Sequence, residues 1–197
     1  MYDKNVAVIG CTIEKTTKND QFREDKIRME LYRIILSLYN EGYRTFTCNP
    51  HSYIGLLGAD TIVMLREAGK CPEIILSVAI PETAFPADTD KVYRSLYDDL
   101  IKQADNKKIL PEKEFFGNAL VCGHIIFYYD DFSTEMQQIC ASGTPYTNIR
   151  KTDCTAGETA VTCGKECVPI SFYGYWYREY RMRISAAFLW KSHRNNR

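Results

Sequence analysis

The chain has 197 residues, with 25 Lys and Arg against 25 Asp and Glu, 45% hydrophobic and 13% aromatic residues, and a mean hydropathy of -0.32. This composition is typical of a soluble globular protein and excludes a disordered chain. The sequence contains no run of about 18 apolar residues, and Asp3 and Lys4 follow Met1 closely. We therefore expect neither a membrane span nor a signal peptide, and we expect a cytoplasmic protein.

Strands and helices alternate along the first three quarters of the chain. The run VAVIG predicts a strand over residues 6–10, and a helix follows over 24–40, where apolar residues recur at helical spacing until Gly42. Further strands are predicted over 45–48, 74–79, 107–110, 125–129 and 146–149. Further helices are predicted over 53–68, after 88–90 with Val92, Leu96 and Leu100 on one side, over 112–121, and from a Thr134 and Gln137 capping box to Gly143.

This alternation predicts an α/β fold of three layers. Strands joined through amphipathic helices form a mostly parallel, Rossmann-like sheet with helices on both faces. The pattern ends near Arg150, so we divide the chain into a Rossmann-like domain over residues 1–150 and a C-terminal extension over 151–197.

The C-terminal extension is aromatic and basic. Its last part carries six basic residues (Arg178, Arg181, Arg183, Lys191, Arg194 and Arg197) and one acid, Glu179, although the formal net charge of the whole chain is zero. A net charge of zero argues against nucleic-acid binding by the whole surface, but this segment leaves nucleic-acid stacking open. Docking on its own domain or on a second subunit is favoured, so a homo-oligomer is expected as one alternative.

The eight cysteines predict neither disulfides nor a metal. Five of them lie within strand and helix patterns and are expected as free thiols: Cys11, Cys48, Cys71, Cys122 and Cys140. Cys154, Cys163 and Cys167 cluster, but their spacing lacks the paired Cys-x2-Cys of structural zinc sites, and a fourth ligand such as His193 would have to be recruited. We therefore predict no metal and no cofactor.

The ligand crevice of an open parallel sheet lies at the carboxyl ends of its strands. This rule selects the loops after the first, second, third and fifth strands, and it gives the candidate ligand-binding residues Gly10, Cys11, Thr12, Asn49, Ser52, Ser133 and Thr134. The glycine-rich dinucleotide and P-loop motifs are missing from these loops. Ser133 and Thr134 suit a phosphate contact, but ordinary helix capping is the favoured interpretation. His51 is expected to be solvated, and His124 is expected to be a strand residue.

The order VAVIGCTIEK, EGYRTFTC, LGADTIVMLREAGKCPEIILSVAIP and IIFYYDDFSTEMQQICASGTPYTNI resembles the SLOG superfamily of Rossmann-like domains, in its YpsA-like branch. The resemblance covers about residues 6–149. It is carried by Gly10, Glu14 and Lys15 after the first strand, loosely by Asp60, and by Phe132, Ser133 and Thr134 in the last turn. The resemblance implies Asp60 as a further candidate ligand-binding residue. In the second loop, Asn49 and Tyr53 stand where the family has glycines, and Gly55 stands where it has an acid. The resemblance implies a nucleotide-derived ligand and a degraded or repurposed phosphate site.

Three functions follow as hypotheses. The first is a non-catalytic protein that binds a nucleotide or nucleotide-derived small molecule. The second, implied by the phosphoribohydrolase (LOG) branch of the same superfamily, is glycosidic-bond hydrolysis with Asp60 or Glu82 as the acid/base. The third is an interaction or oligomerising protein that uses the segment from Phe172 onward. The sequence names no catalytic residue.

Overall fold

The computed structural model describes residues 4–10, 24–83, 85, 89, 91–128 and 133–149, and all of them belong to the compact unit Met1–Glu158. Its strands are β1 (Asn5–Gly10), β2 (Thr45–Cys48), β3 (Ile75–Pro81), β4 (Asn106–Leu110), β5 (His124–Tyr128) and β6 (Tyr146–Asn148). Its helices are α2 (Glu24–Asn40), α3 (Tyr53–Glu67), α4 (Lys91–Gln103), α5 (Glu112–Ala119) and α6 (Thr134–Ser142). The predicted alternation is confirmed. The predicted boundary near Arg150 lies outside the described residues.

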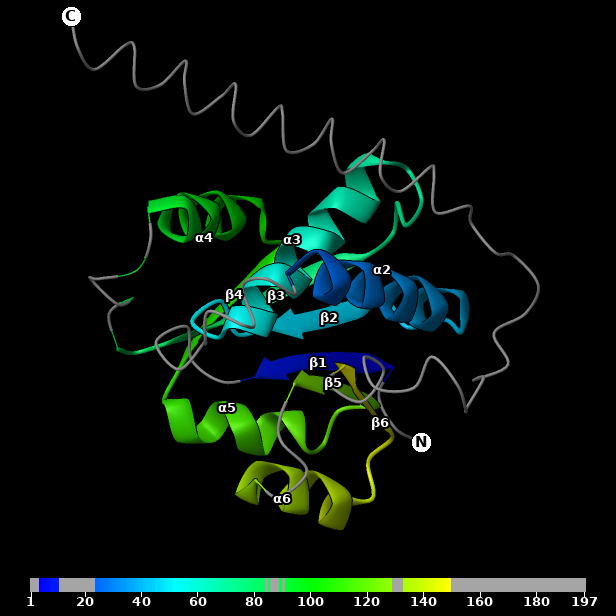
Figure 1. The fold of residues 1–197 in the computed structure, drawn as a ribbon, viewed down its shortest axis with the longest axis vertical. Coiled ribbons are helices and arrows are strands. Elements are labelled where there is room, and N and C mark those ends of the chain that lie inside the picture. The colour runs from blue at the N-terminus through cyan, green and yellow to red at the C-terminus, as the bar shows by residue number, and fades with distance from the viewer. Residues whose placement is uncertain are drawn as a thin grey trace, which may run out of the picture. The chain divides into compact units, whose positions relative to one another are not determined.

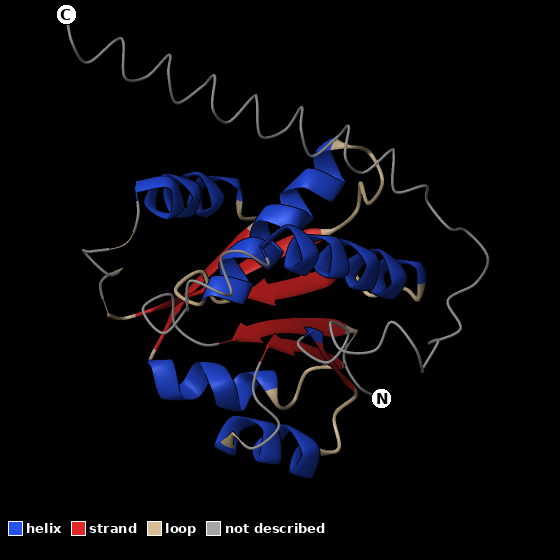
Figure 2. Cartoon of the chain, viewed as in Figure 1, coloured by secondary structure: helices blue, strands red, loops and turns tan. Residues whose placement is uncertain are grey.

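The six strands form one parallel sheet in the order β4-β3-β2-β1-β5-β6. Helices α2, α3 and α4 cover one face, and α5 and α6 lie on the other, so the fold has the three layers of a Rossmann-like domain (Figures 1 and 2). We call the first side the α3 face and the second the α5 face. The predicted fold class is confirmed for the described part of the chain.

Alternating strand residues supply two separate cores. On the α3 face, Val6 and Val8 of β1 join a core that includes Leu31 and Ile35 of α2 and most of α3. On the α5 face, Ala7 and Ile9 of the same strand join a smaller core with Phe115, Ala119 and Ile139. The period of two along β1 therefore matches a strand buried on both sides.

Helix α3 is the most buried helix of the described domain. Twelve of its residues are buried, and it contacts both α2 and α4 as well as the three strands below it. Gly58 permits its close approach to β1, because a Cβ atom at this position would lie 2.8 Å from Cγ1 of Val8. The expected glycine stop of α2 is also confirmed, since Gly42 has a φ of +93°.

One residue of a predicted helix face was wrong. The sequence placed Val92 with Leu96 and Leu100 on one side of α4, but Val92 is 57% exposed. Leu96 and Leu100 do pack with the core, and Tyr93 and Tyr97 join them there in place of Val92. The residues 93, 97 and 100 follow the helical repeat better than 92, 96 and 100, and the tyrosines bury more surface than a valine.

Candidate functional site

The strand order reverses at β1. The chain runs outward from β1 through β2 and β3 to β4, and then returns to β5 on the other side of β1, where Gly10 pairs in register with Tyr128. In open parallel sheets a ligand crevice lies at the carboxyl edge beside such a reversal. Cys11 and Thr12 follow β1 at this point but lie outside the described residues, as do residues 129–132 after β5.

The loop between β2 and α3 uses its own polar groups. The Asn49 side-chain oxygen accepts from the backbone N–H of His51 at 2.9 Å. The Ser52 hydroxyl donates to the Asn49 carbonyl at 3.0 Å and accepts from the Gly55 N–H at 2.9 Å, so Ser52 is the N-cap of α3. The Ser52 backbone N–H also donates to the Asn49 carbonyl. These bonds engage the polar side chains of the loop and the Gly55 N–H in contacts within the protein.

The start of α3 is also closed by packing. A Cβ atom on Gly55 would lie 2.0 Å from the Asn49 carbonyl oxygen, so this glycine accommodates the chain's own backbone rather than a ligand. Residues 50–55 are all buried, and Ser52 and Tyr53 are each 1% exposed. The N-terminus of α3, which follows the second predicted loop, is therefore buried within the protein.

A polar network joins α2, α3 and α4 beneath this loop. Arg28 of α2 donates to the carboxylates of Glu24, at 2.9 Å, and Asp60 of α3. The second carboxylate oxygen of Glu24 accepts from the hydroxyls of Tyr53, at 3.2 Å, and Tyr93, at 2.8 Å. One glutamate thus connects the first turns of three helices.

The contacts of this network determine which of its side chains carry a charge. Burial alone would lower the pKa of the Arg28 guanidinium, but the carboxylates of Asp60 and Glu24 outweigh burial and raise that pKa above its ordinary value. Burial and then the Glu24 charge raise the pKa of both the Tyr53 and the Tyr93 phenols. The tyrosines therefore stay neutral hydrogen-bond donors, and Arg28 stays a cation.

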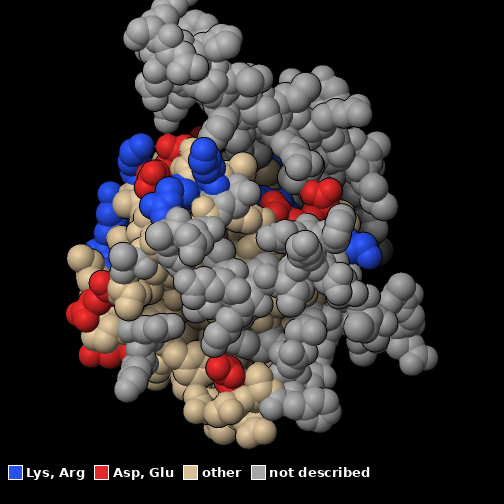
Figure 3. Space-filling view, turned by 60° about the vertical axis from the view of Figure 1, so that its left-hand side comes forward, with Lys and Arg blue, Asp and Glu red and all other residues tan. Residues whose placement is uncertain are grey.

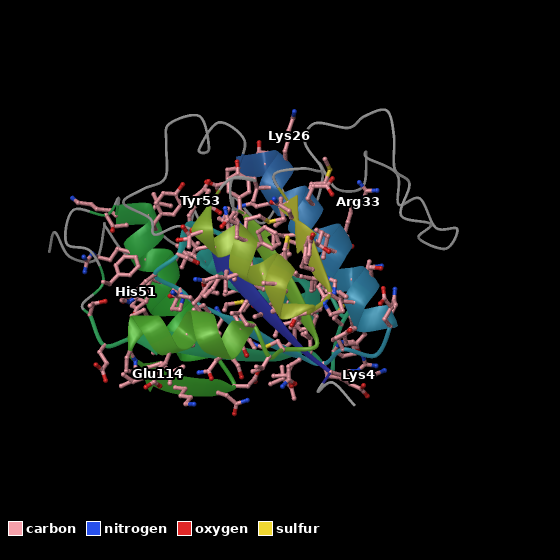
Figure 4. The ribbon with its side chains drawn as sticks, turned by 90° about the horizontal axis from the view of Figure 1, so that it is seen from below. Lys4, Lys26, Arg33, His51, Tyr53 and Glu114 are labelled. Carbon is pink, nitrogen blue, oxygen red and sulfur yellow. The ribbon has the colours of Figure 1, made fainter. Side chains whose placement is uncertain are left out.

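His51 is buried, which corrects the expectation that it is solvated. It is 6% exposed, and its ring lies edge-on to Phe85 at a centroid distance of 5.3 Å and beside Tyr97 at 5.5 Å. Phe85 and Tyr97 stack at 4.3 Å. His51 lies at the opposite end of the domain from Lys4, which precedes β1 (Figure 4). These partners could not be predicted from the sequence around His51, because both follow β3 along the chain.

The start of α6 is open, in contrast to that of α3. Ser133 is the N-cap, and its hydroxyl accepts from the Met136 N–H at 3.1 Å. Ser133 is partly exposed, and Thr134 is exposed. The favoured interpretation of Ser133 as a cap is confirmed, but the expected capping box of Thr134 and Gln137 was wrong by one residue, because Ser133 already occupies the N-cap position.

The predicted ligand residues therefore separate into two groups. Asn49, Ser52 and Asp60 lie on the β2 and α3 side and are engaged in bonds within the protein. Gly10 ends β1 beside β5, and Ser133 and Thr134 open the helix that follows β5. Asp60 is 1% exposed and paired with Arg28. Whether any of these residues binds a ligand stays a prediction.

Other predicted residues are accounted for by structure. Glu82 is exposed in the loop after β3. His124 is the first residue of β5, where its Nε2 lies 3.0 Å from the Thr147 hydroxyl of β6. Cys48, Cys71, Cys122 and Cys140 are free thiols, as predicted, while Cys11, Cys154, Cys163 and Cys167 lie outside the described residues.

Four residues of the polar network, Glu24, Arg28, Tyr53 and Tyr93, were not predicted as site residues from the sequence. A signal for the first two was present, because Glu24 and Arg28 continue the buried line of Leu31 and Ile35 toward the start of α2. Ionisable residues in line with an apolar stripe predict a buried polar contact, but the partner cannot be read from spacing. Asp60 lies 32 residues from Arg28 along the chain.

The described residues contain no group of three or more His, Cys, Asp and Glu side chains that could hold a metal ion. None of the helices in this part of the chain is both long and apolar enough to cross a membrane. A scan against protein-family models found no match, and a search of curated proteins found no similar sequence.

Proposed function

We propose that this domain binds a nucleotide or nucleotide-derived small molecule at the carboxyl edge of the sheet, between β1 and β5, without catalysis. The observation that carries the proposal is the reversal of strand order at β1, which separates the chain segments that leave β1 and β5. The resemblance of residues 6–149 to SLOG domains supports the same ligand class.

The first turns of α2, α3 and α6 differ in how well they could hold an anion, which indicates where a phosphoryl group would bind. The first turn of α2 carries Glu24 and Asp25, which repel an anion, and the first turn of α3 is buried. Helix α6, which follows β5 along the chain, has a single acid in its first turn, Glu135, and begins at an exposed Thr134. A phosphoryl group is therefore favoured at α6, and the base or sugar is favoured toward the end of β1 at Gly10.

Hydrolysis has less support than binding. A general acid/base needs a carboxylate free to exchange a proton with the substrate. Asp60 is engaged with Arg28 inside the protein, and Glu82 is an exposed loop residue. The described face in Figure 3 carries acidic as well as basic side chains, which does not favour a broad polyanion surface there.

A pair of near-isosteric variants tests the phosphoryl position. Thr134→Glu adds a second negative charge, next to Glu135, in the first turn of α6, where it stabilises the helix but repels a phosphoryl group. Thr134→Gln has nearly the same shape without the charge. Thermal unfolding of the full chain is measured with AMP, ADP, ADP-ribose and NAD, since a ligand at one hundred times its Kd stabilises by ~2.7 kcal/mol.

We expect a nucleotide to raise the Tm of the natural chain and of Thr134→Gln, and to raise that of Thr134→Glu far less. Thr134→Glu without ligand is expected to be as stable as the natural chain or slightly more stable, which separates lost binding from lost folding. Unchanged melting temperatures at millimolar concentrations of all four compounds would reject the ligand class. Equal responses of the two variants would reject the position at α6.

A further inference from the structure

The α5 face has a groove that the helices leave open. It lies over β2, β3 and β4 beside α5, has a volume of about 380 Å3, and is lined by residues of β1 through β4 and of the α5 region. Figure 4 views the domain from this side. The volume falls within the range of roughly 300–1,000 Å3 that is typical of small-molecule pockets. Ile75, on the same face of β3, is 37% exposed, so the sheet is incompletely covered here.

The floor of the groove contains a polar row across the sheet. Register pairs Thr47 of β2 with Ser77 of β3, and Ser77 with Asn106 of β4. Register partners in neighbouring strands present their side chains to the same face, so these three residues form one continuous line. Strands buried on both faces are normally continuous apolar runs, and hydroxyls at partnered central positions depart from that pattern.

The polar side chains of the groove are available to a ligand. Within the described part of the chain, the side chains of Thr47, Ser77, Asn106, Asn5 and Asn118 make no hydrogen bond, although all five line the groove. Hydroxyl and amide groups each offer both donors and acceptors. This is the combination that matches the hydroxyl groups of a polyol, each of which also donates and accepts.

The charged and apolar lining residues of the groove indicate two further properties of the ligand. Lys107 and Lys108 are the charged residues among those that line the groove, so its lining is cationic. Lys108 pairs in register with Ala79, whose side chain belongs to the core of the α5 face, which puts Lys108 on the groove side. Phe115 of α5 also lines the groove and gives it an apolar side, although its ring belongs largely to the core of the α5 face.

We propose that this groove is a second binding site, for a small polyhydroxylated molecule with one acidic group, such as a sugar phosphate or a sugar acid. The Thr47, Ser77 and Asn106 row binds the hydroxyl groups, and the Lys108 ammonium binds the phosphate or carboxylate. The site lies on the flat of the sheet rather than at the carboxyl edge between β1 and β5. It does not depend on the proposed nucleotide function.

Nuclear magnetic resonance of the 15N-labelled full chain tests the proposal residue by residue. The probes are glucose 6-phosphate and gluconate, which carry the two acidic groups, with glucose and inorganic phosphate as partial ligands. We expect saturable amide shifts at Thr47, Ser77 and Asn106 with at least one of the two acidic probes. The acidic probe that binds identifies the anionic group, and glucose or phosphate alone is expected to bind more weakly.

Matched variants separate ligand contact from folding. Thr47→Val combined with Ser77→Ala removes both hydroxyls and is expected to weaken binding about tenfold or more. Lys108→Gln is expected to weaken it comparably. Thr45→Val, on the same strand and face but outside the groove lining, and Lys102→Gln, on α4, are expected to bind like the natural chain. A native-like amide spectrum of each variant shows that it is folded.

Three results would overturn the proposal. They are the absence of saturable shifts at millimolar concentrations of both acidic probes, an equal response to inorganic phosphate alone, and an equal loss of binding in Thr45→Val. Shifts induced by nucleotides at Gly10 and Thr134 report on the proposed function instead, so the two proposals fail separately.

Discussion

On the α3 face, three helices bury the central strands in a continuous core and close the start of α3 against solvent, whereas on the α5 face two helices leave part of the sheet open. The same strands therefore meet a fully packed layer on one side and a partly covered layer on the other. β3 illustrates the contrast, since Leu76 is fully buried while its neighbour Ile75 is 37% exposed.

The polar groups of the two faces therefore differ in whether they are paired within the protein or available to a ligand. Polar groups on the α3 face, such as Asp60 and Ser52, are buried and paired within the protein. Polar groups on the α5 face, such as Thr47 and Ser77, have no partner among the described residues. Substitutions on the α3 face should therefore cost much stability, and comparable substitutions on the α5 face should cost little.

The largest expected effect is at the Arg28 and Asp60 pair. Arg28→Met leaves the Asp60 carboxylate buried without its cation, and we expect a loss of about 3–5 kcal/mol in the free energy of unfolding. The double variant Arg28→Met, Asp60→Leu removes both charges and is expected to regain much of that loss. Urea unfolding followed by far-ultraviolet circular dichroism measures both variants. A double variant less stable than Arg28→Met would contradict a buried ion pair.

Two helical glycines give the most direct comparison of the two faces. Gly55→Ala in α3 forces a Cβ atom to within 2.0 Å of the Asn49 carbonyl oxygen, and we expect a loss of about 1–3 kcal/mol. Gly117→Ala in α5 meets nothing within 4 Å, and we expect a gain of about 0.5–1 kcal/mol from helix propensity. The same unfolding measurement applies. Similar changes at both positions would remove the contrast between the faces.

Removing the serine cap of α3 should cost more stability than removing the serine cap of α6, in line with the difference between the two faces. Ser52→Ala removes the buried hydroxyl that accepts from the Gly55 N–H. We therefore expect the free energy of unfolding to fall by an amount near the upper end of the usual range of about 0.5–2 kcal/mol. Ser133→Ala exposes the Met136 N–H to water near the surface, and a loss near the lower end is expected. The Tm values of both variants, measured in one buffer, decide the order. A larger loss at Ser133 would contradict it.

Local patterns in the sequence account for most elements of this fold. The helix at 24–40 and the strand at 45–48 were predicted with the bounds that the structure has, because each is marked by its own periodicity or β-branched run and by a nearby glycine. The sequence also indicated the free thiols and the serine cap of α6. These features depend on residues within a few positions of one another.

Features that depend on distant residues could not be predicted. The strand order, the Arg28 and Asp60 pair and the burial of His51 each require contacts between separate elements. The groove depends on where helices are missing from a face, and no local pattern reports that. Thr47 and Ser77 were visible as polar residues within strands, but only the register shows that they adjoin.

The smallest expected effect is a pH dependence at His124, at the margin of the α3 face, where its ring lies edge-on to Tyr43 at 6.2 Å. Burial lowers the pKa of His124 below its ordinary value of 6.5, against the opposing charge of Glu41. The unfolded chain therefore takes up a proton more readily than the folded chain. The stability that neutral His124 contributes is fully present above pH 6.5 and is lost as pH falls through the lowered folded pKa. Comparing the pH dependence of unfolding in the natural chain with that in His124→Gln cancels the other titrating groups. Parallel pH profiles for the natural chain and His124→Gln would mean that His124 is as solvated in the folded chain as in the unfolded chain. The contrast between the two faces would then be confined to the centre of the sheet.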